Sequence, residues 1–148
     1  MLTPLLLSST GFDRLQKPHD FVKPELATGK VLKRRLGGQH GQIYYLYVPR
    51  SVRESAPLMI SIHGVSRNAR RHARMLSSMA ENYGIILLAP LFGRKQFTDY
   101  QRLGRVGHGP RADLALDRIV GEVLYLTGAD TSRLYLFGYS GGGQQDNP

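Results

Sequence analysis

The chain has 148 residues, of which 41% are hydrophobic and 21% are charged, a composition typical of a globular domain with its own core. It contains no cysteine, which excludes disulfide bonds, thiolate metal sites and cysteine catalysis. The formal net charge is +9, from 20 Lys and Arg against 11 Asp and Glu, which raises the possibility of an anionic partner.

The first 29 residues contain three prolines and show no sustained hydrophobic period. They are predicted to form a poorly ordered tail, and residues 30–148 the N-terminal part of one domain. The opening apolar run Met1–Leu7 is short and has no basic residue before it, so it is a poor signal peptide. No apolar run approaches the roughly 20 residues that span a bilayer. We therefore expect a cytoplasmic protein with no membrane partner.

Two extended runs around a glycine-rich turn predict an antiparallel hairpin. The runs are residues 30–36 and 42–48, with Gly37–Gly41 between them. Pro49 is expected to end the second strand, because proline has no backbone N–H to donate to a neighbouring strand.

The rest of the chain alternates between buried strands and amphipathic helices. Near-continuous apolar runs predict strands at residues 57–63, 84–90 and 133–138. Between these strands, apolar side chains at helical spacing predict two helices. Alternating strands and helices indicate a parallel sheet with helices on both faces, following the antiparallel hairpin.

Helix-end residues and apolar faces support both helices. The first is expected to start near Ser66 or Asn68 and to end at Gly84. The second is expected to run from about Ala112 to Gly128, with Asp113 in its positive first turn. The predicted apolar stripes consist of His72, Met75, Leu76, Met79 and Tyr83 in the first helix, and of Leu116, Ile119, Val120, Val123 and Leu124 in the second.

Residues 91–110 form a long connection without a clear period, where linkers in such folds typically have about 2–6 residues. Long connections in compact domains are often lids or binding loops. Its apolar side chains Phe92, Phe97, Tyr100 and Leu103 are candidates for pocket walls. An irregular surface loop with incidental aromatic residues is the alternative interpretation.

The run Gly138-Tyr139-Ser140-Gly141-Gly142 follows the last predicted strand. A serine is a weak nucleophile unless it is exposed, aimed and deprotonated by a base. Glycines two residues before and after the serine permit the sharp strand-to-helix turn that exposes it. In this position the motif predicts Ser140 as a nucleophile.

A second motif, His63-Gly64-Val65-Ser66, follows the third predicted strand. Acyl transfer builds negative charge on the carbonyl oxygen, which fixed N–H donors must stabilise. In this architecture one donor comes from this loop and the other from the residue after the nucleophile, here Gly141. Both motifs lie at carboxyl ends of parallel strands, where open α/β sheets bind their ligands.

On these residues the chain resembles the α/β-hydrolases, in particular esterases similar to polyhydroxyalkanoate depolymerases and feruloyl-esterase-like proteins. The resemblance covers about residues 30–143 and rests on Tyr44–Pro49, His63-Gly64, Leu88-Ala89-Pro90, Arg111–Leu114 and Phe137–Gly142. It implies a small-molecule or polyester ester substrate, and neither a metal nor an organic cofactor.

The same resemblance implies a role for individual residues. Ser140 would be the nucleophile, and Gly141 and Val65 (or Ser66) would donate backbone N–H groups to the oxyanion. His63, Gly64 and Ser66 would support the oxyanion loop, with His63 not acting as the base. Tyr100 and Tyr139 are candidates for the substrate pocket.

In that family an acidic residue and then a histidine follow the nucleophile. Here only Asp146 follows Ser140, and it is too close in sequence to lie on the next strand. We therefore expect an incomplete sheet, cut short after the nucleophile turn and inactive alone. The earlier candidates for an acid or base fit other roles: His72 on an apolar stripe, His108 and Asp99 in the long loop, Asp113 at a helix start, and His19 and His40 in solvent. An open apolar edge on the last strand should make the isolated chain marginally stable or prone to aggregation.

Three alternatives remain open at this stage. The first is a serine peptidase of the same fold, because the nucleophile turn does not distinguish esters from amides. The second is a non-catalytic truncated chain or pseudo-enzyme that binds a polyanion or a partner, and the third is a gene remnant or an incomplete gene model. The densest basic group, Arg67, Arg70, Arg71 and Arg74, has no interleaved aromatic residues, which favours a solvated helix face over a nucleic-acid site. Near a pocket, these arginines would favour acidic substrates. The sequence makes no prediction about oligomeric state.

Overall fold

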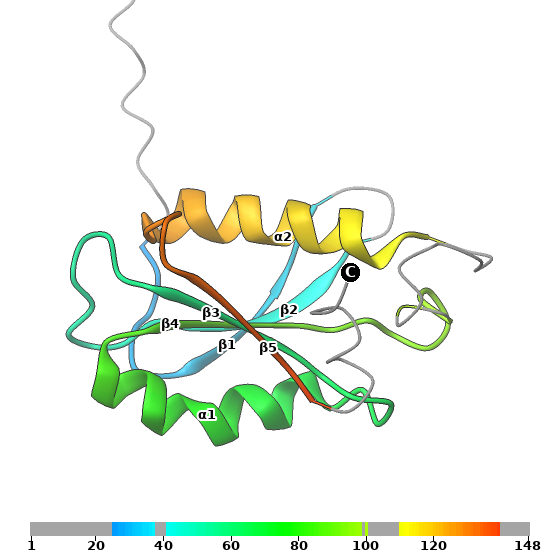
Figure 1. The fold of residues 1–148 in the computed structure, drawn as a ribbon, viewed down its shortest axis with the longest axis horizontal. Helices are drawn as coiled ribbons and strands as arrows, with labels where there is room; N and C mark the ends of the chain where they lie inside the picture. Colours follow the sequence, from blue (N-terminus) through cyan, green and yellow to red (C-terminus); the bar gives the residue numbers. More distant parts are fainter. Residues whose placement is uncertain (1–24, 38–40, 99, 101–109, 140–148) are drawn as a thin grey trace, which may run out of the picture.

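Five strands form one mixed sheet with a helix on each face (Figure 1). The computed structural model describes residues 25–37, 41–98, 100 and 110–139. The elements are β1 (Val31–Arg35), β2 (Ile43–Tyr47), β3 (Leu58–Ile62), α1 (Ala69–Tyr83), β4 (Ile86–Pro90), α2 (Ala112–Thr127) and β5 (Leu134–Gly138). The predicted order of elements is confirmed, with bounds close to those expected.

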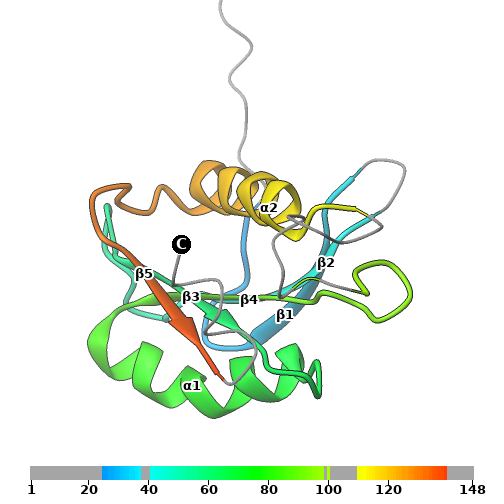
Figure 2. The ribbon, with the colours of Figure 1, turned by 45° about the vertical axis from the view of Figure 1, so that its right-hand side comes forward.

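The strand order across the sheet is β1-β2-β4-β3-β5. The hairpin strands β1 and β2 are antiparallel, and β2 is also antiparallel to β4. Strand β3 is parallel to β4 on one side and to β5 on the other. The carboxyl ends of β3, β4 and β5 therefore meet at one edge of the sheet, where both predicted motifs begin (Figure 2).

In the central strands, alternate side chains pack against different helices. On β2, Tyr44 and Leu46 join the main core under α2, whereas Tyr45 and Tyr47 belong to the smaller clusters under α1. The near-continuous apolar runs in the sequence are explained by this two-sided burial. The predicted α/β architecture with both faces covered is confirmed.

The buried face of α1 differs from the predicted stripe. Its buried residues are Ala69, His72, Ala73 and Ala80, whereas Met75 and Tyr83 are 62% and 74% exposed. The prediction was wrong at Met75 and Tyr83 because it followed the large apolar side chains. The sheet instead contacts the alanine side, where short side chains let the helix approach closely.

The C-terminal ends of both helices agree with the prediction made from their glycines. Gly84 and Gly128 end α1 and α2 in the left-handed region, with φ of 65° and 66°, as predicted. Asn68 occupies the position before α1, but its side chain makes no capping hydrogen bond. Asp113 lies in the first turn of α2, where it pairs with Arg111.

Two clusters of a tyrosine, a glutamate and an arginine tie the sheet to its helices. On one face, the Tyr44 hydroxyl donates to Glu122 of α2 and accepts from Arg34 Nε at 3.0 Å. On the other face, the Tyr47 hydroxyl donates to Glu81 of α1, which also pairs with Arg50 at 3.8 Å. Burial and the neighbouring carboxylates raise the pKa of both tyrosines, so they remain protonated donors at neutral pH.

Strand β5 exposes apolar side chains on both of its faces. Leu134, Tyr135, Leu136 and Phe137 are between 39% and 54% exposed. Within the described part of the chain, β5 pairs with β3 and with no strand on its other side. The sheet is therefore open at β5, and the predicted apolar edge is confirmed.

Candidate active site

The ends of β3 and β5 bring the two sequence motifs side by side. Ile62, the last residue of β3, is in register with Gly138, the last residue of β5. The Tyr139 N–H then donates to the Ile62 carbonyl at 3.2 Å. The loop that starts at His63 and the segment that leads to Ser140 thus leave the sheet at the same place. Ser140 and Gly141 themselves lie outside the described residues.

His63 is fully buried, and both of its ring nitrogens are engaged. The Phe92 N–H donates to Nε2 at 2.9 Å, so the ring proton is on Nδ1, which donates to the Gly64 carbonyl at 3.0 Å. Burial is the main cause that lowers the pKa of His63, which keeps the ring neutral. This histidine holds the loop after β3 against the segment after β4.

The residues that follow His63 form a tight turn with free donors. The Arg67 N–H donates to the Gly64 carbonyl at 2.9 Å, which places Val65 and Ser66 at the centre of the turn. Val65 is 61% exposed. No described residue accepts a hydrogen bond from the N–H of Val65 or Ser66. Two backbone donors are therefore available at the carboxyl end of β3.

Arg67 locks this turn in place, a role that the sequence did not indicate. Its Nη1 donates to the carbonyls of Phe92 and Phe97, each at 2.7 Å, and Nη2 donates to that of Thr98 at 3.2 Å. The backbone of Arg67 is in the left-handed region, with φ of 55°, which is unfavourable for a non-glycine residue. The interpretation of the arginine cluster as a solvated helix face was wrong for Arg67. Arg70, Arg71 and Arg74 are exposed, as expected.

Replacement of Arg67 by methionine is expected to lower the free energy of unfolding by about 2–3 kcal/mol, because it removes charged hydrogen bonds to three carbonyls. Chemical denaturation measures the change. The matched control is Arg70→Ala, which removes an exposed arginine and should change stability by less than about 0.5 kcal/mol. Equal effects of the two substitutions would contradict the assigned role of Arg67.

The aromatic residues after β4 are buried core residues that pack against the loop after β3. Phe92, Phe97 and Tyr100 belong to the main core. The Tyr100 hydroxyl donates to the His63 carbonyl at 2.9 Å. Tyr100 also lines a cavity of about 390 Å³, together with Val65, Arg67, Arg94 and Thr98. The predicted pocket residue Tyr100 thus borders a cavity at the turn, while Leu103 lies outside the described residues.

A second cavity lies between the start of α1 and the end of β5, and we call it the α1–β5 cavity. It measures about 380 Å³ and is lined by Ser66, Asn68, Arg71, His72, Met75, Phe137 and Tyr139. His72, expected to be structural, is buried and has its Nδ1 3.2 Å from Ser61 Oγ. Its ring packs edge-on against Tyr139, with centroids 5.8 Å apart. The predicted pocket residue Tyr139 therefore borders a cavity as well.

The other candidate acids and bases lie outside the described residues, namely His19, His40, Asp99, His108 and Asp146. Among the residues that are described, no three His, Asp or Glu side chains are grouped so as to hold a metal ion. In the same part of the chain, neither helix is long and apolar enough to cross a membrane.

In sequence, the chain is similar to two fungal enzymes. It is 29% identical over 107 residues to feruloyl esterase B of Thermothelomyces thermophilus and 28% identical over 107 residues to feruloyl esterase B of Talaromyces funiculosus. Both similarities cover 70% of the chain, but only 37% and 30% of the two enzymes. The chain thus spans about a third of the length of these relatives. No family model matches it.

In structure, the chain is similar to several hydrolases. Poly(aspartic acid) hydrolase-1 of Sphingomonas sp. KT-1 has a TM-score of 0.69 at 21% identity, over 80% of this chain and 49% of that one. The poly(3-hydroxybutyrate) depolymerase LpqC of Bordetella parapertussis has a TM-score of 0.63 at 22% identity, over 80% and 45%. The acetyl xylan esterase of Aspergillus awamori has a TM-score of 0.64 at 19% identity, over 78% and 44%. Each of these enzymes extends well beyond the part that matches.

Proposed function

We propose that this chain, whose fold is that of the α/β-hydrolases, is part of a serine hydrolase that cleaves carboxylic esters, with Ser140 as its nucleophile. The observation that carries the proposal is the register of β3 and β5, which brings the donor turn at Val65 beside the residue that precedes Ser140. The sequence similarity to two feruloyl esterases favours ester substrates over amides.

In the proposed reaction, Ser140 Oγ attacks the ester carbonyl carbon and transfers its proton to a base. The negative charge that develops on the carbonyl oxygen accepts hydrogen bonds from the backbone N–H groups of Gly141 and of Val65 or Ser66. Collapse of the tetrahedral intermediate releases the alcohol, and water then attacks the acyl-serine to release the acid. By analogy with measured oxyanion donors, each such N–H contributes about 10²–10³ in turnover.

His63, Gly64 and Ser66 would support this donor turn without taking part in proton transfer. The two ring nitrogens of His63 are already engaged by Phe92 and Gly64, so it is not available as the base. We therefore assign the base and its acidic partner to residues outside the described part of the chain. By analogy with triad knockouts, loss of the base would lower turnover by about 10⁶.

A fluorophosphonate probe tests the nucleophile directly. We expect it to label the product of the complete reading frame that contains these residues, and Ser140→Ala to abolish the label. Ser78→Ala, an exposed serine on α1, is the matched control and should retain it. A folded product that resists the probe, or a label that survives Ser140→Ala, would refute the assignment. Turnover of 4-nitrophenyl acetate without turnover of 4-nitroacetanilide would separate an esterase from a peptidase.

A further inference from the structure

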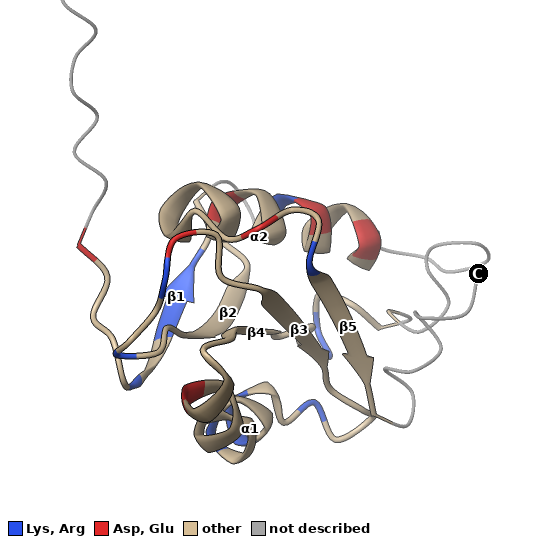
Figure 3. Cartoon of the chain, turned by 60° about the vertical axis from the view of Figure 1, so that its left-hand side comes forward, with Lys and Arg blue, Asp and Glu red and all other residues tan. Residues whose placement is uncertain are grey.

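The two faces of the sheet carry charges of opposite sign. Helix α1, on one face, contains three arginines and one glutamate, whereas α2, on the other face, contains one arginine and three acidic residues. The glutamate of α1, Glu81, lies near the end of the helix and pairs with Arg50. Figure 3 shows the contrast, with basic residues on β1 and along α1 and several acidic residues on α2. The α1 side of the molecule therefore carries an excess of positive charge.

Strand β1 adds further cations to the α1 side. Val31 packs against the clusters under α1, so the alternation of a strand places Lys33 and Arg35 on the same face. Both side chains are exposed. Arg34, which lies between them, points to the other face, where it pairs with Glu122 of α2 at 3.7 Å. The positive charge on the α1 side thus comes from two elements that are distant in sequence.

A groove lies between these two sets of cations. It measures about 640 Å³, and its lining includes Arg70, Arg71 and Arg74 of α1 and Tyr45 of β2. Tyr45 is paired with Lys33 in the register of the hairpin, so β1 continues the surface on the far side of the groove. We refer to the five exposed cations Lys33, Arg35, Arg70, Arg71 and Arg74 as the α1 basic face.

The charges of the α1 basic face are not compensated. None of its five cations forms an ion pair with a described residue. Arg74 follows Arg70 and Arg71 by four and three residues, a spacing at which like charges on a helix repel each other. Cations near a helix N-terminus also oppose the helix dipole. This arrangement does not stabilise α1, and such an excess of positive charge attracts anions.

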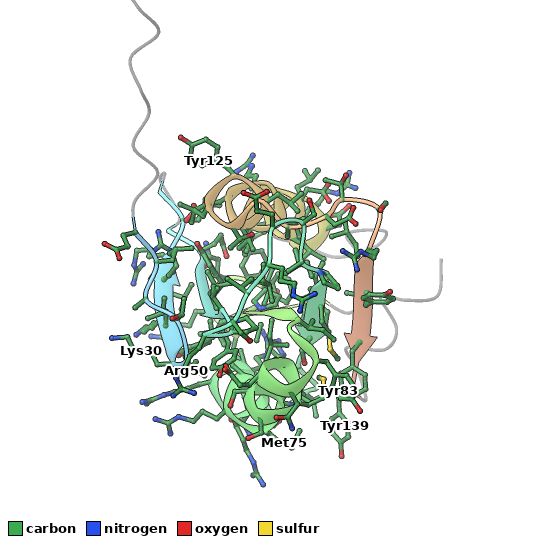
Figure 4. All side chains as sticks on the ribbon, turned by 90° about the vertical axis from the view of Figure 1, so that its left-hand side faces the viewer. Lys30, Arg50, Met75, Tyr83, Tyr125 and Tyr139 are labelled. Atoms are coloured by element: carbon green, nitrogen blue, oxygen red, sulfur yellow. The ribbon has the colours of Figure 1, made fainter. Side chains whose placement is uncertain are left out.

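Exposed apolar side chains border the α1 basic face. Met75 and Tyr139 are each 62% exposed, and they line the α1–β5 cavity together with Arg71. Figure 4 shows Met75 and Tyr139 on the α1 side of the molecule and Tyr125 on the opposite side. A nucleic acid backbone would neutralise the arginines but would offer Met75 no apolar surroundings. The boundary between lipid headgroups and acyl chains suits both kinds of side chain.

We propose that the α1 basic face binds peripherally to an anionic phospholipid membrane. Its cations contact the phosphate and carboxylate groups of the lipids, and Met75 and Tyr139 enter the headgroup region. The expectation of no membrane partner rested on the lack of an apolar run long enough to span a bilayer, and peripheral binding does not require such a run. The inference goes beyond the proposed esterase activity and does not depend on it.

Vesicle flotation tests this proposal, because bound protein rises with the vesicles whereas protein aggregates sink. We expect the chain to partition about tenfold more strongly onto phosphatidylcholine vesicles that contain phosphatidylserine than onto phosphatidylcholine alone. Arg74→Glu and Lys33→Glu should each weaken this binding about tenfold, because each replaces an attracted charge by a repelled one. Both side chains are exposed, which makes the variants compatible with folding. Arg118→Glu, the same reversal at an exposed position of α2, is the matched control and should retain the binding.

A second pair of variants distinguishes a lipid surface from a nucleic acid. Met75→Ser should weaken binding to the anionic vesicles about threefold or more, because it removes an apolar side chain from the headgroup region. It should leave binding to duplex DNA, measured by fluorescence anisotropy, unchanged. Leu114→Ser, at an exposed apolar residue of α2, is the matched control and should retain vesicle binding.

Equal partitioning onto the anionic and the neutral vesicles would overturn the proposal. Equal losses in Arg74→Glu and Arg118→Glu would also overturn it, because the binding would then reflect net charge alone. Tight binding to DNA, together with flotation that Met75→Ser does not weaken, would overturn the lipid surface in favour of a nucleic acid. Fluorophosphonate labelling is a separate measurement, so failure of the esterase assignment would leave this proposal unchanged.

Discussion

Two lysines on β5, Tyr135→Lys with Leu136→Lys, are expected to convert a self-associating chain into a monomer. Successive side chains of a strand point to opposite faces, so the two substitutions place one charge on each exposed face. Apolar side chains and unpaired backbone groups on an edge strand are a template for pairing with another chain, and charges at such an edge oppose that pairing.

Sedimentation velocity at micromolar concentrations measures the effect. The unchanged chain should sediment as a broad distribution of oligomers and the double variant mainly as one small species. Tyr125→Lys is the control, because Tyr125 is an exposed tyrosine of α2 that lies on the other side of the molecule from β5 (Figure 4). A monodisperse, reversibly melting monomer of the unchanged chain would contradict the prediction, as would an equal improvement by Tyr125→Lys.

Replacement of His63 by leucine is expected to lower the free energy of unfolding by about 1–3 kcal/mol. The substitution leaves the buried Phe92 N–H without its partner, and one such unsatisfied group costs about 1–3 kcal/mol, whereas the Gly64 carbonyl still accepts from the Arg67 N–H. Urea denaturation of the β5 double-lysine variant, with and without the leucine, measures the difference in a soluble background. A loss below about 1 kcal/mol would show that the ring does not hold the loop.

The same histidine should make stability depend on pH. Its pKa is lowered in the folded state, so the unfolded chain takes up a proton first as the pH falls. Stability is therefore fully present above the ordinary histidine pKa of about 6.5 and decreases below it, by at most about 1.4 kcal/mol per pH unit for this residue. Burial also lowers the pKa of His72, which adds to the slope. Urea midpoints between pH 8 and pH 5 should fall less steeply in His63→Leu, and equal slopes would contradict the assignment.

Local patterns were sufficient for the order of elements and for the place of the candidate site. Strand period, helix period and glycine at helix ends depend on neighbours in sequence, so β1 to β5, α1, α2 and the endings at Gly84 and Gly128 could be predicted. The motif His63-Gly64 also marked the turn that contains Val65 and Ser66, since a loop that follows a parallel strand opens at the carboxyl edge of the sheet. The apolar run at β5 was also predicted, and in the described part of the chain β5 pairs with β3 alone, which leaves this run at an exposed edge.

Only the tertiary structure decided which groups meet across the chain. The buried face of α1 is its alanine side, because short side chains let the helix pack close to the sheet. The sequence prediction missed this face because it followed only the spacing of large apolar residues. In sequence, Arg67 could not be distinguished from the neighbouring surface arginines. In the structure, its guanidinium donates to the carbonyls of Phe92, Phe97 and Thr98. Likewise, His72 of α1 lines a cavity together with Phe137 and Tyr139, which come from a distant part of the sequence. The physical reason is common to all three: contacts between distant segments depend on the register and packing of the sheet, which leave no periodic trace in the sequence.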